Sequence, residues 1–286
     1  MAWPTAGRRS RRRAGKGAPA GGRAPAKKGG VLAVLRKRLA SRGRGHGHAR
    51  PKQGSTRGVL RAAGLVLALA LGAIVALQGW YLARILWWTQ FDPSTTSFMS
   101  DRLERMREKD PGAALRHRWV PYARISRHLA RAVIAAEDAR FTTHEGVDWD
   151  AIEKAIEDNM RRGKVVRGGS TITMQLAKNL FLSGERSYLR KGQEVAITYM
   201  IEAVMSKRRI LEIYLNVAEW GEGVFGAEAA AQHYWGVSAA QLGPAQAATM
   251  AAMLPRPRFF DRNRDSPALA RRVQFVQRWM GTVALP

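Results

Sequence analysis

Cysteine is absent from the 286-residue chain, so this chain can form no disulfide, no thiolate metal site and no cysteine nucleophile. It also lacks the His-Glu-x-x-His pattern of zinc proteases and the P-loop of nucleotide-binding proteins. Acidic residues are missing from the first 91 positions, and Asp92 is the first carboxylate along the chain. These absences exclude thiol chemistry and give no support to the zinc-protease and P-loop classes.

The positive charge is concentrated near the N-terminus. Residues 1–61 hold 18 lysines and arginines, whereas the other 225 residues hold 30 basic and 22 acidic residues. The formal net charge of +26 is therefore mainly a property of the N-terminal stretch. Because residues 1–58 are rich in Gly, Ala, Pro, Lys and Arg, we interpret them as a disordered basic tail. Within it, residues 31–39 could form a basic amphipathic helix at a membrane surface.

A long apolar run follows the tail. No charged residue occurs from Ala62 to Ala83, and these 22 residues would span about 33 Å as a helix, enough to cross a bilayer core of about 30 Å. Trp80, Tyr81, Trp87 and Trp88 then cluster where aromatic side chains favour the membrane interface. We therefore predict a transmembrane helix at 59–84, with the basic N-terminus in the cytoplasm. A cleaved signal peptide fits less well, because the run is long and starts some 60 residues into the chain.

The remainder is predicted to be mainly α-helical. Residues 85–112 are polar and are interpreted as a juxtamembrane connector, and residues 113–286 as a globular domain. Helix starts are indicated at Asp148, Ser187, Ser206 and Ser266, and Phe225 to Trp235 is compatible with a further helix. No alternating pattern lasts long enough to predict a sizeable sheet.

Two adjacent carboxylates, Glu137 and Asp138, end an apolar helical run at 129–136, and Phe141 follows. A carboxylate beside apolar surface has its pKa raised toward the range useful for proton transfer. The alternative for an isolated pair of this kind is a solvated helix end.

A Gly-rich segment opens the next candidate helix. Thr171, Gln175 and Lys178 are spaced i, i+4 and i+7, so they share one face behind Gly168 and Gly169. A glycine-rich helix N-terminus with hydroxyls and a nearby lysine can bind an anion. The alternative is an ordinary amphipathic helix with a good N-cap.

Further along, Arg190, Lys191 and Glu194 can converge on one helix face. The alternative is a surface ion pair of little energetic weight. Together the two segments place a second carboxylate among cations, in contrast to Glu137. Two carboxylates in contrasting settings suggest chemistry at a sugar, clustered cations suggest a phosphate-bearing partner, and the anchor suggests a substrate in the bilayer.

Four ordered motifs make the chain resemble the monofunctional biosynthetic peptidoglycan transglycosylases, which are related to the glycosyltransferase domain of class A penicillin-binding proteins. The motifs lie at 137–146, 169–179, 190–194 and 207–216, and the segments 223–235 and 254–257 also look like this family. Met174 departs from the pattern, since many members have a second Gln there, and we expect only a change in local packing.

The resemblance implies a lysozyme-like, two-lobed α-helical glycosyltransferase domain. In this family the 4-hydroxyl of a lipid II sugar attacks the anomeric carbon of the growing chain with inversion, and undecaprenyl pyrophosphate leaves. Glu137 would be the general base, and Glu194 would orient or stabilise the leaving group. His144 is expected to shape the first motif, as Phe141 mainly does, and Glu212 and Tyr214 to hold the fold. The substrate-binding residues implied by the motifs are Asp138, Phe141, Ser170, Thr171, Gln175, Lys178, Asn179, Arg190 and Lys191.

The same resemblance implies no obligatory cofactor, although a divalent cation, Mg²⁺ or Mn²⁺, near Glu194 stays open. The implied partners are lipid II, the growing glycan chain and the membrane, with cell-division or elongation proteins left open and no nucleic acid expected. The implied location is the bacterial inner membrane, crossed once, with the catalytic domain on the periplasmic side.

Three other interpretations compete. A lytic transglycosylase on a related fold would cleave glycan with a single acidic residue, but a neutral glycan needs no cationic cradle such as Lys178 and the 190–194 segment would form. A truncated bifunctional penicillin-binding protein would retain Ser-x-x-Lys and Lys-Thr-Gly motifs, and neither occurs. A non-enzymatic membrane protein whose basic tail binds nucleic acid or anionic lipid accounts for the tail alone.

Overall fold

The computed structural model describes residues 54–163, 168–182 and 187–286. The predictions of a disordered tail and of an amphipathic piece at 31–39 therefore concern residues outside the described ranges. Residues 62–286 form one compact unit, and the packing described below lies within it.

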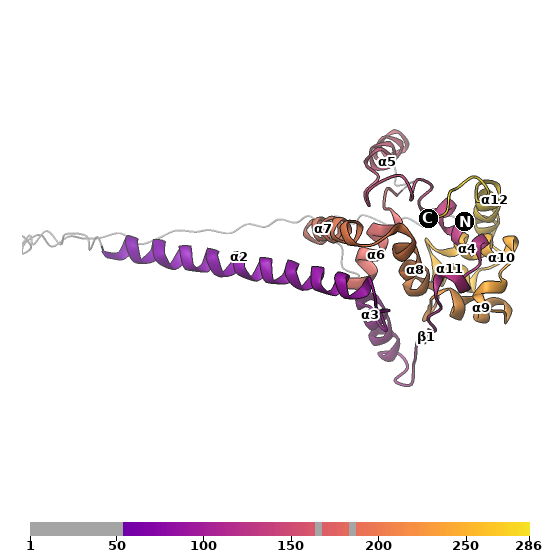
Figure 1. Cartoon of the computed structure of the whole chain (residues 1–286), viewed down its shortest axis with the longest axis horizontal. Coiled ribbons are helices and arrows are strands. Elements are labelled where there is room, and N and C mark those ends of the chain that lie inside the picture. Colours follow the sequence, from indigo (N-terminus) through magenta and orange to yellow (C-terminus); the bar gives the residue numbers. More distant parts are fainter. Residues whose placement is uncertain (1–53, 164–167, 183–186) are drawn as a thin grey trace, which may run out of the picture. The chain divides into compact units, whose positions relative to one another are not determined.

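The described chain is mainly helical, as predicted (Figure 1). Its helices are α2 (Gly54–Trp88), α3 (Ser97–Arg107), α4 (Arg127–Glu137), α5 (Trp149–Arg162), α6 (Ile172–Phe181), α7 (Tyr188–Val204), α8 (Lys207–Val217), α9 (Ala227–Trp235), α10 (Pro244–Met253), α11 (Pro257–Arg262) and α12 (Pro267–Trp279), with short 3₁₀ turns η1 (Tyr122–Arg124) and η2 (Ala239–Gln241).

The predicted helix starts are confirmed by side-chain caps. Asp148, Ser187, Ser206 and Ser266 each accept a hydrogen bond from a backbone N–H in the first turn of α5, α7, α8 and α12. Such caps satisfy N–H groups that have no partner within the helix, and each is worth about 1 kcal/mol. Local polar residues thus determine where these helices begin.

One small sheet interrupts the helices and corrects one predicted boundary. Strands β1 (Arg116–His117), β3 (Val224–Phe225) and β2 (Glu219–Gly221) lie in that order, with β1 parallel and β2 antiparallel to β3. A helix was compatible with Phe225 to Trp235, but Phe225 pairs in the sheet. Gly226 then turns the chain at φ 83°, where an added Cβ would lie 2.7 Å from the Asn216 carbonyl oxygen, and α9 starts at Ala227.

Two groups of helices carry the core (Figure 1). Helices α4, α10 and α12 pack together, and α6 packs against α3, α7 and α8. The largest fully buried side chains include Trp220, Tyr214, Phe141 and Phe225. Gln175 of α6 donates a hydrogen bond to Glu137 at the end of α4, so the first and second predicted motifs meet where the two groups of helices adjoin.

Within the described residues, one helix is long and apolar enough to cross a membrane, over Thr56–Trp88. Most of its apolar side chains are exposed, but its last turns are held by the domain. Tyr81 and Trp88 are buried against the Phe181 ring of α6, with ring centroids 5.0 and 5.2 Å away. Helix α2 begins at Gly54, before the predicted start at residue 59, and runs four residues past the predicted end at Arg84, where its last turns pack on the domain.

Helix α3 lies in the segment predicted to be a connector, and it packs on α6. Arg102 of α3 makes a bidentate ion pair with Glu219 of β2, at 2.7 and 3.0 Å, and both side chains are buried. A buried pair of this kind is sensitive to loss of either partner, because the other charge is left uncompensated. The pair therefore holds α3 against the domain.

Candidate active site

A cavity of about 900 Å³ opens among α3, α6, α7, α8, β2 and residues 254–263. A pocket of this size is in the usual range for a substrate site. Seven residues predicted for the site contribute to its wall: Ser170, Gln175, Lys178, Asn179, Arg190, Lys191 and Glu194. The structure thus brings the second and third motifs to one surface.

Cationic groups surround Glu194 on that wall. Lys191 Nζ lies 2.5 Å from Glu194 Oε1, and Arg190 Nη1 lies 3.7 Å from Oε2. Lys191 Nζ also reaches Ser170 Oγ at 3.4 Å. Burial lowers the pKa of Lys178, and the nearby charges of Arg190 and Lys191 add to this lowering while Glu194 opposes it. Three cationic groups around one carboxylate leave a surplus of positive charge, which suits an anionic ligand.

Glu137 lies at the C-terminal end of α4 and meets the cavity wall through Gln175. Gln175 Nε2 donates to Glu137 Oε2 at 2.8 Å, whereas Oε1 is buried and has no hydrogen-bond partner in the part of the chain described. Burial raises the pKa of Glu137 and the Asp138 charge adds to the rise, while Gln175, Arg272 and Lys178 oppose it. A carboxylate in this setting can accept a proton near neutral pH.

The two candidate carboxylates share one helix as a common neighbour. Gln175 of α6 bonds to Glu137, and Lys178, which follows on the same helix, interacts electrostatically with both Glu137 and Glu194. The cavity wall between them is therefore built by α6. Glu137 itself does not line the cavity, and Gln175, which does, lies between Glu137 and the cavity wall as its hydrogen-bond partner.

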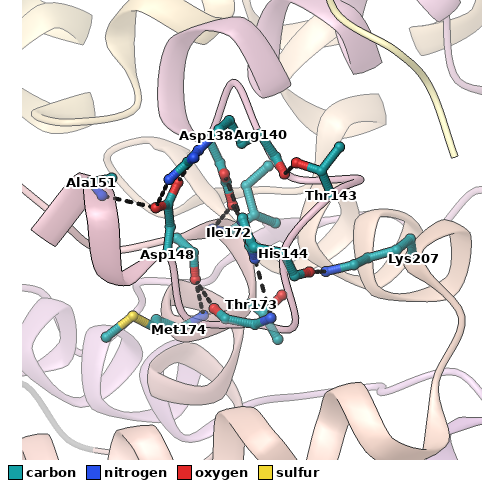
Figure 2. Close-up of polar contacts among 12 residues, drawn as sticks. Asp138, Arg140, Thr143, His144, Asp148, Ala151, Ile172, Thr173, Met174 and Lys207 are labelled. Carbon is teal, nitrogen blue, oxygen red and sulfur yellow. Dashed lines mark hydrogen bonds and ion pairs between the residues drawn. The ribbon is translucent and has the colours of Figure 1, made fainter.

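Asp138, Phe141 and Thr171 do not line the cavity, and their contacts lie within the first motif and at the start of α6. Figure 2 shows Asp138 with His144 and Ile172. Asp138 accepts hydrogen bonds from His144 Nε2, at 2.9 and 3.0 Å, and from the Ile172 backbone N–H at 3.0 Å. Thr171 caps α6 and donates to the Gly146 carbonyl at 2.5 Å. The Phe141 ring is fully buried, with Lys207 Nζ 4.9 Å from its centroid.

Gly146 makes the close approach of this loop possible. Its φ is 86°, and an added Cβ would lie 2.6 Å from Glu202 Cγ and 2.8 Å from Thr198 Cγ2 of α7. A side chain there would be both strained and obstructed. The first motif therefore ends in a glycine because the loop passes directly over α7, and its polar residues fasten the end of α4 to the start of α6.

The residues around Glu194 do not fit the divalent cation that the resemblance left open. Glu194 is surrounded by lysine and arginine, whereas Mg²⁺ and Mn²⁺ need several oxygen ligands. Elsewhere in the described chain, ligand atoms of Asp138, His144 and Asp148 lie within 4.8 Å of one another. There Asp138 is bonded to His144 and Ile172, and Asp148 to Arg140 and the Ala151 N–H, as Figure 2 shows. These contacts account for that cluster as part of the fold.

Several wall residues were not predicted. Helix α3 contributes Phe98, whose ring centroid lies 5.7 Å from Lys178 Nζ, and Arg102. Tyr214, assigned by the resemblance to the fold alone, lines the cavity and donates to Gln175 Oε1 at 2.9 Å. Arg256 lies in the segment 254–257 that supported the resemblance but received no role. The segment 254–257 was the signal that could have identified Arg256 as a cavity residue. Helix α3 carries none of the motifs on which the resemblance rests, so its two residues had no such signal.

Comparison with known proteins gives a consistent result. The Transglycosylase family profile matches residues 104–281. A biosynthetic peptidoglycan transglycosylase of Janthinobacterium sp. (strain Marseille) is 62% identical over 213 residues, which cover 74% of this chain and 92% of that protein. The protein of the same description from Thiobacillus denitrificans is 55% identical over 230 residues, covering 80% and 99%. One from Bordetella pertussis is 56% identical over 225 residues, covering 77% and 93%.

The contacts of Asp138 predict a structural effect of its removal. Replacing Asp138 with Ala leaves the His144 ring and the Ile172 N–H without their acceptor, so we expect the free energy of unfolding to fall by about 2–3 kcal/mol. Asp150→Ala removes an exposed carboxylate that pairs with Arg140 and serves as the matched control. Urea titration in detergent, followed by tryptophan fluorescence, measures both. Equal urea midpoints for Asp138→Ala and Asp150→Ala would contradict the structural role of Asp138.

Proposed function

The chain belongs to the biosynthetic peptidoglycan transglycosylases, and from this premise we propose that its cavity joins lipid II units into glycan strands and releases undecaprenyl pyrophosphate. The enzyme is a peptidoglycan glycosyltransferase of cell-wall synthesis with the lysozyme-like helical fold that the resemblance implied. One observation carries the detailed proposal: a buried carboxylate, with one oxygen that has no partner in the described part of the chain, and a surplus of cations adjoin the same helix, α6.

In the proposed reaction Glu137 is the general base. The 4-hydroxyl of the acceptor sugar gives its proton to Glu137, and its oxygen forms a bond to the anomeric carbon of the growing chain. The bond from that carbon to the pyrophosphate oxygen breaks, and its electron pair leaves with the pyrophosphate. Attack from the face opposite the leaving group inverts the anomeric carbon. Glu137 and the cation cluster of Lys178, Arg190 and Lys191 are therefore assigned to opposite faces of the sugar.

The cation cluster is assigned to the leaving group. Lys178, Arg190 and Lys191 offset the charge that develops on the pyrophosphate oxygen, and such preorganised charges act mainly on the transition state. Glu194 holds Lys191 and Arg190 in place through its ion pairs. Ser170 and Asn179, which also line the wall, are assigned to sugar and phosphate oxygens. Asp138, Phe141 and Thr171 act by positioning the first motif.

The cation cluster also separates this function from glycan cleavage. A lytic enzyme needs a carboxylic acid at the glycosidic oxygen, and its neutral leaving sugar gains nothing from three cations. A pyrophosphate leaving group gains from each of them. The surplus of positive charge beside Glu194 therefore favours synthesis.

We also propose that α2 crosses the inner membrane with the basic N-terminus in the cytoplasm and the domain outside. The basic excess before Arg61 supports this orientation, and the domain contacts of Tyr81 and Trp88 would keep the cavity near the bilayer. Lipid II and the glycan chain are the partners on that side. Proteins of cell division or elongation stay a prediction.

Substitution of Glu137 tests the base. Glu137→Gln keeps the shape of the side chain but cannot take the proton, so we expect lipid II polymerisation to fall by at least about 100-fold with the fold retained. Glu145→Gln, at an exposed position in the same motif, is the control and should keep the wild-type rate. Initial rates from labelled lipid II measure the effect, with circular dichroism to verify folding. Polymerisation by Glu137→Gln within threefold of wild type would exclude this base.

The two shifted pKa values predict the pH dependence of kcat. Glu137 must be ionised, so the rate should rise with pH through a pKa above the ordinary 4.5. Lys178 must be protonated, so the rate should fall through a pKa below the ordinary 10.5. In Lys178→Arg the alkaline limb should move to higher pH, because a guanidinium keeps its proton. Polymerisation rates across pH measure both limbs, and an alkaline limb that stays in place would remove Lys178 from the mechanism.

Protease treatment of sealed, right-side-out vesicles tests the proposed orientation. A protease added outside should digest the domain after Arg84 and leave an epitope on the N-terminal tail intact. Permeabilised vesicles, in which both should be cleaved, provide the control. Loss of the N-terminal epitope in sealed vesicles would reverse the topology.

A further inference from the structure

A chain of two hydrogen bonds connects three helices beneath the cavity. Tyr214 of α8 donates from its hydroxyl to Gln175 Oε1 of α6 at 2.9 Å. Gln175 Nε2 donates in turn to Glu137 Oε2 at the end of α4, at 2.8 Å. The Tyr214 side chain is almost fully buried, with a relative exposure of 1%. Three helices from separate parts of the chain thus meet at one carboxylate.

The donor and acceptor in each of these two hydrogen bonds follow from the chemistry of the Glu137 carboxylate and the Tyr214 hydroxyl. An ionised carboxylate only accepts hydrogen bonds, so Gln175 must turn its NH₂ group toward Glu137. Its carbonyl oxygen then faces Tyr214, and a carbonyl also only accepts, so the Tyr214 hydroxyl must donate. Burial raises the pKa of Tyr214 well above its ordinary value, and the charges of Glu137 and Asp138 add to the rise, so the hydroxyl keeps its proton.

The two hydrogen bonds give the two carboxylate oxygens of Glu137 different surroundings. Oε2 is held by Gln175, whereas Oε1 is buried and has no partner among the described residues. A buried polar atom without a partner is unfavourable, and an incoming hydroxyl would satisfy it. We propose that Tyr214 is a positioning residue that acts through Gln175: it fixes Oε2 of Glu137 and thereby makes Oε1 the oxygen that takes the proton from the acceptor hydroxyl.

This inference rests on the proposed function, and it changes two assignments. Gln175 was predicted to contact substrate and Tyr214 to hold the fold. In the structure one amide hydrogen and one carbonyl lone pair of Gln175 are committed to Glu137 and Tyr214. Gln175 is therefore assigned to the orientation of the base.

Loss of the Tyr214 hydroxyl should change the pH dependence of the reaction. The charged groups that face Glu137 are Asp138 beside it, Lys178 on α6 and Arg272 on α12. The Gln175 hydrogen bond favours the ionised form of Glu137 and opposes the rise in its pKa. Without Tyr214 the amide is free to rotate, this bond weakens, and the pKa of Glu137 rises further. The acid limb of the rate profile should then move to higher pH.

Tyr214→Phe in the full-length chain tests the inference. We expect kcat for lipid II polymerisation to fall about tenfold, the scale of one hydrogen bond to a charged group, with KM within twofold of wild type and the acid limb at higher pH. Tyr122→Phe is the matched control, because the Tyr122 hydroxyl is buried without a hydrogen-bond partner in the described chain and does not line the cavity. It should leave kcat, KM and the acid limb unchanged. Normal kinetics in Tyr214→Phe would overturn the inference.

Gln175→Met provides an independent measurement if Tyr214→Phe folds poorly. Gln175→Met removes the amide that connects Tyr214 to Glu137, and it should also move the acid limb to higher pH. An unmoved acid limb would overturn the inference. In the double variant, Tyr214→Phe should add nothing to Gln175→Met, because Tyr214 acts only through the amide. Additive losses would instead assign Tyr214 a direct contact with substrate.

Glu137→Gln, measured in parallel, separates this inference from the proposed function. If Glu137→Gln is inactive while Tyr214→Phe is normal, the base stands and only the positioning role falls. If Glu137→Gln polymerises lipid II, both fall.

Discussion

The burial of the Glu137 carboxylate is the constraint on which the rest of the site depends. Burial raises its pKa, so ionisation of Glu137 opposes folding. This contribution to stability is complete below the ordinary pKa of 4.5 and is lost as the pH rises through the raised value. Gln175, Lys178 and Arg272 each favour the ionised form and limit that loss. The surrounding helices thus keep a reactive carboxylate at a tolerable energetic cost.

Helix α6 carries most of the consequences of this constraint. Its N-terminus is held by Asp138 and capped by Thr171. Its middle presents Gln175 to Glu137 and contributes Lys178 to the cation cluster. Its last residue, Phe181, packs against Tyr81 and Trp88 of α2. One ten-residue helix therefore joins Glu137, the cation cluster and the apolar helix, so a displacement of α6 would disturb all three.

The two carboxylates illustrate how environment separates similar groups. The Glu137 carboxylate is buried, and its Oε1 has no hydrogen-bond partner among the described residues, whereas Glu194 is paired with Lys191 and Arg190. The first setting favours proton uptake and the second favours a fixed ion pair. Because the surplus charge beside Glu194 is positive, the proposed reaction assigns the pyrophosphate to that part of α6 and the acceptor hydroxyl to the part beside Glu137.

Local signals in the sequence determined the helical class, the apolar helix and the starts of α5, α7, α8 and α12, because caps and periodicity act within a few residues. The sequence also contained the ordered motifs on which the family resemblance rested. It placed Gln175 and Lys178 on one helix face, Glu194 on a face with Arg190 and Lys191, and Glu137 at the end of an apolar helical run. Only the tertiary structure brought Tyr214, Phe98 and Arg102 to the cavity and moved Asp138 behind it, because those contacts join residues about 35 to 120 positions apart and depend on how helices pack. Spacing along a helix predicts which side chains share a face, but the partner of that face is decided by the fold.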